Sequence, residues 1–551
     1  MQDNPYSKCI GIALPAIFGI LAFFLVVGHR VLDVENVAWL GEPRVGADAA
    51  TSYLGWHFFR NDEWRFPPGL NPHYGLEFSN SIVYSDSIPL LAILFKPFSS
   101  LLPQIFQYFG IWLIACFVLQ AWFAWKLIGI AAESGVVRLL GAGLLVFAPP
   151  MIWRLHGHFS LVGHFLILAA LYLCFRPNKG RRAGLWSLLI TTSALVHGYI
   201  FAMVILLWLA DLLAALSSNE RTLRSTAGEV LVVVLCAFLA CWTAGYFSVG
   251  YSSSPEGFGL FRMNLLSIID SSGWSHILRD LPEGPGDYEG FNYLGLGVII
   301  ASLFALPVLP AQVGGISSSI KRHPALALVL LVLIAFSASN SIGVGTWNFF
   351  LPIPEVLLHA ATAFRSSGRM FWPAFYVLVF GVIVVIVRGY DRWTAAALLA
   401  IALVAQIIDT SAGWLPISEK LMVEQASEWP TQLRAKFWSQ AASKYQNIRR
   451  APPGNARPNW ISIADYAGRN RLATDAVYLA RVGEAGLTAA QWNSEQAINT
   501  GKYDQDSLYI LDNEKVHTAL LHIDQGSDLF AQIDGLFVVA PGWKKCADCS
   551  H

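Results

Sequence analysis

Long apolar runs constrain this chain more than any other feature, because a helix of about 20 apolar residues spans the hydrocarbon core of a bilayer. Hydrophobic residues make up 55% of the 551 residues and charged residues only 13%, a balance that soluble domains do not have. The sequence therefore predicts an α-helical polytopic membrane protein. We expect eleven membrane helices, at residues 10–29, 104–128, 135–152, 160–176, 184–197, 198–216, 227–247, 292–310, 324–340, 371–388 and 394–412.

The connecting segments differ in their content of Lys and Arg, which favour the cytoplasmic side of a membrane. With a cytoplasmic N-terminus, retained as an uncleaved anchor, the basic residues fall in alternate loops. These residues are Lys126, Arg138, Arg176, Lys179, Arg181, Arg182, Arg221, Arg224, Lys321, Arg322, Arg388 and Arg392. We therefore expect a protein of the bacterial inner membrane. Its other loops are then periplasmic, namely 30–103, 153–159, the turn at 197, 248–291 and 341–370, followed by a periplasmic C-terminal segment.

One apolar run is not counted as a membrane span. The segment Ser87–Pro103 is short, contains Lys96 at its centre and is interrupted by three prolines. These features predict a helix that lies in the membrane interface within the first periplasmic loop.

The composition changes after residue 412. The stretch TQLRAKFWSQAASKYQNIRR (431–450) is typical of a helix, whereas SLYILD (507–512) and GLFVVAP (535–541) are typical of strands. We predict a transmembrane module at residues 1–412 and a small periplasmic α/β domain at residues 413–551. Cys546 and Cys549 near the C-terminus are compatible with a disulfide in an oxidising compartment or with a free tail.

The charged and polar residues outside the spans indicate where chemistry takes place. Lys plus Arg and Asp plus Glu balance at 37 each, so nothing in the charge suggests nucleic acid as a partner. Few ionisable residues interrupt the predicted spans, and Asp211 lies near the cytoplasmic end of one. An ion-coupled transporter usually needs such charges at mid-membrane. The sequence therefore favours a site at the outer membrane–water boundary.

Asp48 is the principal candidate in the first loop. It precedes ATSYLGWHFF (50–59), whose apolar residues predict an amphipathic helix on the membrane surface with Asp48 near its N-terminus. A carboxylate there is available as a base or as a cation ligand. The alternative is a helix-capping role, because Asp is a favoured N-cap residue.

Two later periplasmic segments contribute further candidates. Arg365 and Arg369 in FRSSGRMFWP are four residues apart, a spacing that places two guanidinium groups on one helix face. Their forked donors suit phosphate, although snorkelling beside lipid headgroups is the alternative. Asp287 and Glu289 in DYEGFNYLGLG are further acids. Arg154 and His158 in RLHGHFSLVGH are candidates for substrate contacts; metal ligation by the histidines of this segment competes there with local hydrogen bonding.

The layout resembles the GT-C superfamily of membrane glycosyltransferases, which use polyprenyl-phosphate-linked sugars. The resemblance rests on GADAATSYLGW around Asp48 and on YSDSIPLLAILFKP, which contains Tyr84 and Asp86. Together with DYEGFNYLGLG and FRSSGRMFWP, these motifs look like those of a bacterial GT-C-like family. Many GT-C enzymes have adjacent acids in the first loop, whereas here Asp48 is flanked by Ala47 and Ala49.

The resemblance implies transfer of a sugar, with inversion, from a polyprenyl-phosphate donor to a periplasmic glycan, lipopolysaccharide or protein. Asp48 would act as the base, Glu289 or Asp287 would assist it or position a divalent cation, and Arg365 and Arg369 would bind the phosphate. The remaining candidates for sugar or acceptor contacts are His57, Arg60, Tyr84, Asp86, Arg154 and His158.

Two other functions remain open at this stage. A flippase or exporter of lipid-linked sugars would share the phosphate-binding arginines but would need a continuous polar path across the membrane. A membrane acyltransferase would need a histidine within the bilayer, for which His164 and His197 are the candidates.

Overall fold

The computed structural model describes residues 5–176, 182–217, 222–250, 257–546 and 549. The chain forms two compact units. The helical unit comprises residues 1–33, 108–238 and 254–423, and the mixed unit comprises residues 34–107, 239–253 and 424–551. The first loop thus belongs to the same unit as the C-terminal segment, whereas the predicted domain division followed the order of the chain.

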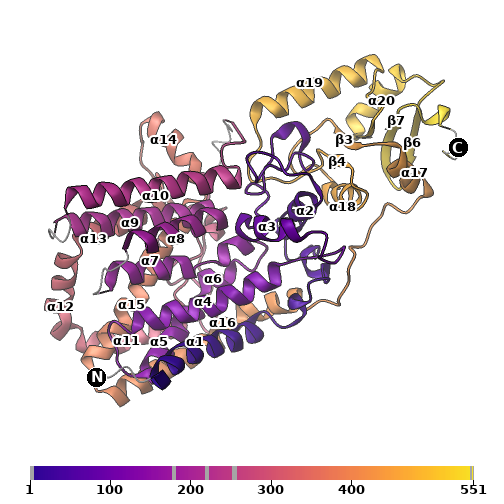
Figure 1. Ribbon diagram of the computed structural model, residues 1–551. Coiled ribbons are helices and arrows are strands. Elements are labelled where there is room, and N and C mark those ends of the chain that lie inside the picture. Colours follow the sequence, from indigo (N-terminus) through magenta and orange to yellow (C-terminus); the bar gives the residue numbers. More distant parts are fainter. Residues whose placement is uncertain (1–4, 177–181, 218–221, 251–256, 547–548, 550–551) are drawn as a thin grey trace. The chain divides into compact units, whose positions relative to one another are not determined.

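All eleven predicted apolar segments are helical in the structure (Figure 1). Phe147 and Ala148 separate α5 from α6, and Ala148 has an extended backbone, as expected for a residue that precedes proline. The final helix continues nine residues past its predicted end, to Leu421. The helices of these segments are α1 (Pro5–Val26), α4 (Phe109–Ile128), α5 (Gly135–Val146), α6 (Pro149–Trp153), α7 (Phe165–Phe175), α8 (Arg182–Val196), α9 (Gly198–Ser217), α10 (Leu223–Ala244), α11 (Leu296–Ala305), α12 (Leu309–Arg322), α13 (Pro324–Ala338), α15 (Trp372–Gly389) and α16 (Arg392–Leu421).

Within the described residues, six helices are long and apolar enough to cross a membrane by length and composition. These apolar helices indicate a membrane protein. The six are Phe109–Ile128, Gly198–Ser217, Leu223–Ala244, Leu296–Arg322, Ser367–Gly389 and Arg392–Leu421.

Close helix packing builds the helical unit. Helix α4 packs against α1, α5 and α7, and α11 packs against α15 and α16. A Cβ atom at Gly19 of α1 would lie only 2.7 Å from the Phe117 carbonyl oxygen of α4, so glycine lets these backbones approach. Between α13 and α15 the chain forms the hairpin of β1 (Ser341–Val344) and β2 (Trp347–Phe350), followed by α14 (Glu355–Ala361).

A buried charged cluster joins α8, α9 and α10. Arg182 forms an ion pair with Asp211, and its Nε donates to both carboxylate oxygens of Glu229 at 3.0 and 3.1 Å. The indole N–H groups of Trp186 and Trp208 donate to Asp211 and Glu229, respectively. Asp211 thus has a charged partner, which the sequence analysis had not assigned.

The mixed unit contains a five-stranded sheet of order β4-β3-β5-β7-β6. Strands β3 (Asn447–Ala451), β4 (Ala473–Thr474) and β5 (Ser507–Leu511) are parallel, while β6 (Leu529–Ile533) and β7 (Leu536–Ala540) form an antiparallel extension. This arrangement confirms a small α/β region. The predicted helix at 431–450 is wrong at its end, because the helix stops at Lys444 and NIRR belongs to β3. The helices after the membrane segments are α17 (Lys436–Lys444), α18 (Trp460–Arg469), α19 (Glu484–Thr500) and α20 (Asn513–His522).

The first loop supplies α2 (Ala47–Asn61) and the short α3 (Pro89–Phe95) to this unit. Every residue of α2 from Ala49 to Arg60 is buried. The predicted helix is present as α2, but its predicted placement with one face on the membrane surface is wrong, since α2 is buried and packs against α18 of the C-terminal segment. The predicted helix within Ser87–Pro103 is present as α3 and a following 3₁₀ turn, and its interfacial placement stays a prediction.

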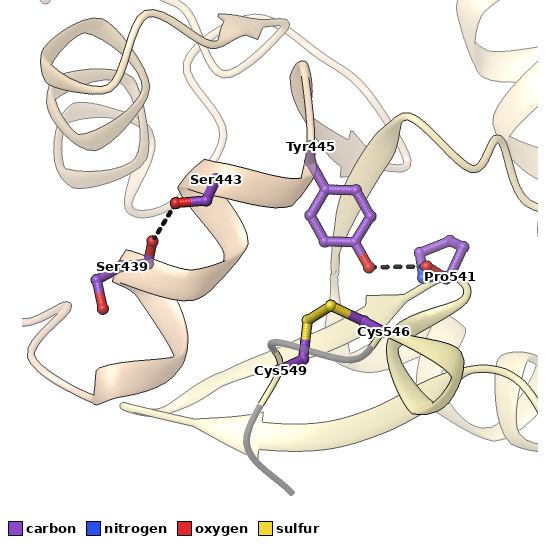
Figure 2. Close-up of a disulfide and its surroundings, with 6 residues drawn as sticks. All are labelled: Ser439, Ser443, Tyr445, Pro541, Cys546 and Cys549. Atoms are coloured by element: carbon purple, nitrogen blue, oxygen red, sulfur yellow. Dashed lines mark hydrogen bonds between the residues drawn. A yellow bond between two sulfur atoms is a disulfide. The ribbon is translucent and has the colours of Figure 1, made fainter.

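Cys546 and Cys549 form a disulfide (Figure 2). In the same view, the Tyr445 hydroxyl donates to the Pro541 carbonyl oxygen at 2.8 Å. The structure therefore supports the disulfide alternative for this C-terminal pair.

Candidate functional site

Three polar segments of the helical unit meet around the carboxylate of Glu289. Arg154 directly follows α6, Glu289 lies in the 3₁₀ helix η6 (Asp287–Gly290), and Arg369 lies in the 3₁₀ helix η9 (Ser367–Phe371). All three side chains are buried. The segments are far apart in the sequence, so the tertiary fold alone assembles this group, which we call the Glu289 cluster.

Both arginines donate to the Glu289 carboxylate. Arg154 Nη1 lies 2.8 Å from Oε2, and Arg369 Nε and Nη2 lie 3.0 and 2.9 Å from the same oxygen. Arg369 Nη2 also lies 2.8 Å from Oε1. Arg154 Nη2 donates to the Glu289 backbone carbonyl at 3.1 Å, so Arg154 fixes the backbone as well as the side chain.

Small residues let η6 and η9 come together. A Cβ atom at Gly368 would lie 2.5 Å from the Gly290 Cα, and one at Gly290 would lie 2.1 Å from the Arg262 carbonyl oxygen. Asn292 Nδ2 donates to the carbonyl oxygens of both Gly290 and Gly368. The motifs DYEGFNYLGLG and FRSSGRMFWP are therefore structural partners, a relation that the sequence did not reveal.

The electrostatics of the cluster favour charged groups. Burial alone raises the pKa of Glu289, but the neighbouring Arg369 and Arg154 outweigh it and hold that pKa well below its usual range. Burial lowers the pKa of Arg154 to about 10, and Glu289 opposes this shift. An ionised Glu289 between two protonated arginines leaves a net charge of +1 on the three side chains.

Aromatic groups and a histidine surround these charges. The Arg154 guanidinium carbon lies 5.4 Å from the Trp372 ring centroid, and that of Arg369 lies 5.1 Å from the Tyr199 ring centroid. His158 Nε2 is 3.7 Å from Glu289 Oε1. The structure thus brings together the predicted residues Arg154, His158, Glu289 and Arg369, and it adds Tyr199 and Trp372, which the sequence analysis missed. Their ordinary aromatic character gave no signal.

Asp287 belongs to a neighbouring network. Its Oδ1 accepts from Arg262 Nε at 3.1 Å, and its Oδ2 accepts from Asn264 Nδ2 and the Gly284 backbone N–H, each at 2.9 Å. Arg262 also donates to Ser341 at the start of β1. Asp287 therefore ties the loop before α11 to the hairpin, and both of its carboxylate oxygens accept hydrogen bonds.

Arg365 does not share a helix face with Arg369, as their spacing had predicted. The chain leaves the helical conformation at Ser366, with φ −87° and ψ 67°, between the 3₁₀ turn Thr362–Phe364 and η9. Arg365 is consequently exposed, whereas Arg369 is buried. The prediction that both arginines lie on one helix face is wrong because the helix is broken between them.

Asp48 lies in the first turn of α2, in the mixed unit, and is half-buried. The N-cap residue of α2 is Gly46, so the capping alternative for Asp48 is wrong by two positions. The Asp48 carbonyl oxygen accepts a hydrogen bond from Ser52 Oγ at 2.8 Å.

The other first-loop candidates have structural partners. Arg60 donates to the carbonyl oxygens of Ser99, Pro103 and Gln104, which anchors the segment after α3. Burial lowers the pKa of His57 to about 4, so its imidazole is neutral at physiological pH. The Tyr84 hydroxyl donates to the Tyr246 carbonyl oxygen at 2.6 Å. Asp86 is half-buried, with a left-handed backbone at φ 52°.

The histidines considered for acyl transfer lie in the helical unit. His164 Nδ1 lies 2.8 Å from the Tyr376 hydroxyl, and its ring packs on Trp372 at 4.1 Å between centroids. His197 Nδ1 accepts from the Tyr199 backbone N–H at 3.1 Å. Each ring nitrogen named here therefore has a local structural partner.

Within the described part of the chain, no group of three or more His, Cys, Asp or Glu side chains is arranged to hold a metal ion. The oxygens of Glu289 and Asp287 accept hydrogen bonds from protein donors instead.

Comparison with known families identifies the chain. Residues 16–411 match the model described as "Domain of unknown function (DUF6311)", and residues 437–541 match the "DUF6311 C-terminal domain". The chain belongs to the DUF6311 family. No curated protein matches the chain. The first DUF6311 region includes the Glu289 cluster and Asp48, and the second includes the five-stranded sheet.

Proposed function

We propose that the chain is a membrane glycosyltransferase of the GT-C type, which transfers a sugar from a polyprenyl-phosphate donor to an acceptor outside the cytoplasm. The Glu289 cluster is the observation that carries this proposal. A polyprenyl phosphate-linked sugar is a phosphodiester with a single negative charge, and the cluster has a net charge of +1. Arginine is well suited to phosphate because its planar donors match the phosphate oxygens.

Glu289 has a positioning role in this proposal. Its low pKa makes it a poor proton acceptor near neutral pH, because an effective general base has a pKa close to the working pH. Its four side-chain hydrogen bonds instead fix the guanidinium planes of Arg154 and Arg369. Fixed donors do not need to reorganise when the phosphate leaving group gains charge.

An exposed apolar segment supports a lipid-linked donor. In the hairpin and α14, the side chains of Trp347, Phe350 and Val356 are 72%, 70% and 79% exposed. Contiguous exposed apolar surface is typical of membrane or lipid contact. This segment leads directly into η9 and Arg369, so a lipid-facing surface and a phosphate-binding residue lie close together in the chain.

The proposed reaction is a single displacement. The acceptor hydroxyl oxygen forms a bond to the anomeric carbon while the bond from that carbon to the phosphate oxygen breaks. Its electron pair leaves with polyprenyl phosphate, and the hydroxyl proton passes to the Asp48 carboxylate. Attack opposite the leaving group inverts the anomeric configuration.

The proposed topology has eleven crossings of the bacterial inner membrane and a cytoplasmic N-terminus. The helical character of all eleven predicted segments supports it. The Cys546–Cys549 disulfide supports a periplasmic C-terminal segment, because disulfides persist mainly in oxidising compartments.

The first test is lipid binding to the purified full chain, measured by native mass spectrometry. We expect polyprenyl phosphate to bind at least tenfold more tightly than uncharged polyprenol. Arg369→Lys keeps the positive charge but loses the paired, planar N–H donors of the guanidinium group, so it should reduce the preference for polyprenyl phosphate at least tenfold. Arg392→Gln, at an exposed arginine, should leave this preference unchanged. Equal binding of the two lipids by the wild type would refute a phosphate site.

The second test is sugar transfer from a panel of polyprenyl-phosphate sugars to cell-envelope glycans. Loss of a positioned base typically lowers the rate by about 10²–10⁴-fold. We expect this loss for Asp48→Asn and wild-type turnover for Glu63→Gln, at an exposed acid in the same loop. Wild-type turnover by folded Asp48→Asn would reject Asp48 as the base. An exporter, in contrast, would move the intact lipid-linked sugar without releasing polyprenyl phosphate.

A further inference from the structure

The mixed unit contains a cavity of about 190 Å³ that none of the roles above uses. It is lined by residues of α19, by the parallel strands β3 and β5 and by Glu77 of the first loop. Pro453 and Asp475 of the lining follow the carboxyl ends of β3 and β4. Because β4 and β5 lie on opposite sides of β3, the strand order changes direction there, and open α/β sheets bind ligands at such points.

Two buried polar groups in the lining lack a partner among the described residues. Arg450 is 3% exposed and Ser494 is 8% exposed, yet Arg450 Nε and Ser494 Oγ make no hydrogen bond. A buried donor without a partner costs about 1–3 kcal/mol. Successive strand residues point to opposite faces of a sheet, so Arg450 points away from the face of β3 that α19 covers, and Ser494 is the unpartnered group on the α19 side. A buried hydroxyl without a partner in the lining of a cavity is typical of a site that a polar ligand completes.

The cations of the lining are already neutralised. Arg449 Nη1 lies 2.9 and 3.1 Å from the two carboxylate oxygens of Glu77, and Arg450 forms an ion pair with Asp512. Asp475 and Asp504 add further carboxylates to the lining. The cavity therefore has no excess positive charge that would hold a phosphate or a carboxylate ligand.

The remaining lining is suited to a hydroxylated ring. Asn493 and Asp504 are exposed, and Asn493 offers both a donor and acceptors. Pro453, Ala490 and the ring of Tyr509 supply apolar surface. Pockets for drug-sized ligands measure about 300–1,000 Å³, so this smaller cavity suits a single ring.

We infer that this cavity binds one neutral sugar ring, either a free monosaccharide or the terminal unit of a glycan. The sugar hydroxyls exchange hydrogen bonds with Ser494, Asn493 and Asp475. The carbon–hydrogen face of the ring packs against Tyr509 and Pro453. Binding at this site goes beyond the proposed transfer reaction and does not depend on it.

The test is saturation-transfer NMR on the purified full chain with the methyl glycosides of glucose, mannose, galactose and N-acetylglucosamine. Inorganic phosphate and ethanolamine serve as charged competitors. Asn493→Trp closes the cavity from an exposed position, and Ser494→Ala removes the unpartnered hydroxyl without adding an atom. Thr488→Trp, at an exposed position of the same helix outside the lining, is the matched control.

We expect a saturable signal from at least one glycoside for the wild type and for Thr488→Trp. The affinity should fall at least tenfold in Asn493→Trp and in Ser494→Ala. The inference is overturned if no glycoside signal saturates, or if Asn493→Trp binds as well as the wild type. The inference is also overturned if phosphate or ethanolamine displaces the glycoside at a concentration below that of the glycoside, because the site would then prefer a charged ligand to a neutral sugar.

Discussion

Replacing Glu289 by Gln removes the negative charge between two buried arginines. Arg154 is fully buried and Arg369 is 6% exposed, so solvent compensates neither charge well. Breaking a buried ion pair by removing one partner costs about 3–5 kcal/mol. Glutamine keeps one acceptor oxygen for four guanidinium contacts, so we expect a loss of about 3 kcal/mol in the free energy of unfolding.

A double-mutant cycle separates charge compensation from packing. Arg154→Met removes one cation but retains a long apolar side chain beside Trp372. In Glu289→Gln/Arg154→Met, the net charge of the three side chains returns to +1. The combined loss should therefore be smaller than the sum of the single losses by at least about 1 kcal/mol.

The assay is reversible unfolding in mixed dodecyl maltoside and SDS micelles, followed by tryptophan fluorescence. Glu133→Gln, at an exposed acid of the same unit, is the matched control and should stay within about 0.5 kcal/mol of the wild type. If Glu289→Gln is as stable as this control, Glu289 does not hold the arginines. Strict additivity in the cycle would refute coupling through charge.

Three further predictions concern other parts of the chain. Burial raises the pKa of Asp475 to about 7, so the stability that this group contributes is present in acid and is lost as the pH rises from about 4 to about 7. Asp475→Asn, facing Arg449, Arg450 and Glu77, should remove about 3 kcal/mol of the difference in unfolding free energy between pH 5 and pH 8, because the loss amounts to about 1.4 kcal/mol per pH unit and ends near pH 7. Arg182→Met should lower the free energy of unfolding by about 3–5 kcal/mol, because it leaves the buried carboxylates of Asp211 and Glu229 without their cation. Adding Asp211→Asn and Glu229→Gln to this variant should restore most of the lost stability in the same micelle assay. Gly468→Ala should lower the free energy of unfolding by about 1–3 kcal/mol, because the new Cβ atom would lie 2.9 Å from His57 Cδ2. Gly228→Ala is the control and should cause no such loss, because no atom lies within 4 Å of a Cβ there. Equal melting temperatures for the two variants would contradict the packing of α18 on α2.

The helices could be predicted because apolar runs report directly on burial or membrane contact. The short apolar runs in SLYILD and GLFVVAP likewise predicted β5 and β7. The end of the helix at 431–450 was missed, because Lys, Gln and Arg favour helices locally while pairing with β4 and β5 places Ile448 and Arg450 in the sheet. At these residues, strand pairing in the folded sheet outweighs the local preference for helix.

The Glu289 cluster could be predicted only in part. Its residues were named from their types and their loops, but the pairing of Glu289 with Arg369 spans 80 residues and leaves no local pattern. The pair Arg365–Arg369 was misjudged because a spacing of four implies one helix face only where the helix is continuous. Ser366 breaks the helix, two residues before Gly368 approaches Gly290.

The burial of α2 changes what the first loop depends on. Phe58 stacks on Tyr74 at 5.0 Å between ring centroids, Trp429 packs on Tyr53 at 5.4 Å, and Thr51 donates to the Tyr478 carbonyl oxygen. The last two contacts come from the C-terminal segment, more than 370 residues away. The helix that carries Asp48 is thus part of one hydrophobic core with the C-terminal domain and cannot keep its surroundings without it. Removal of the C-terminal segment should therefore abolish any activity that needs Asp48, even though the residues around Glu289 remain in the chain.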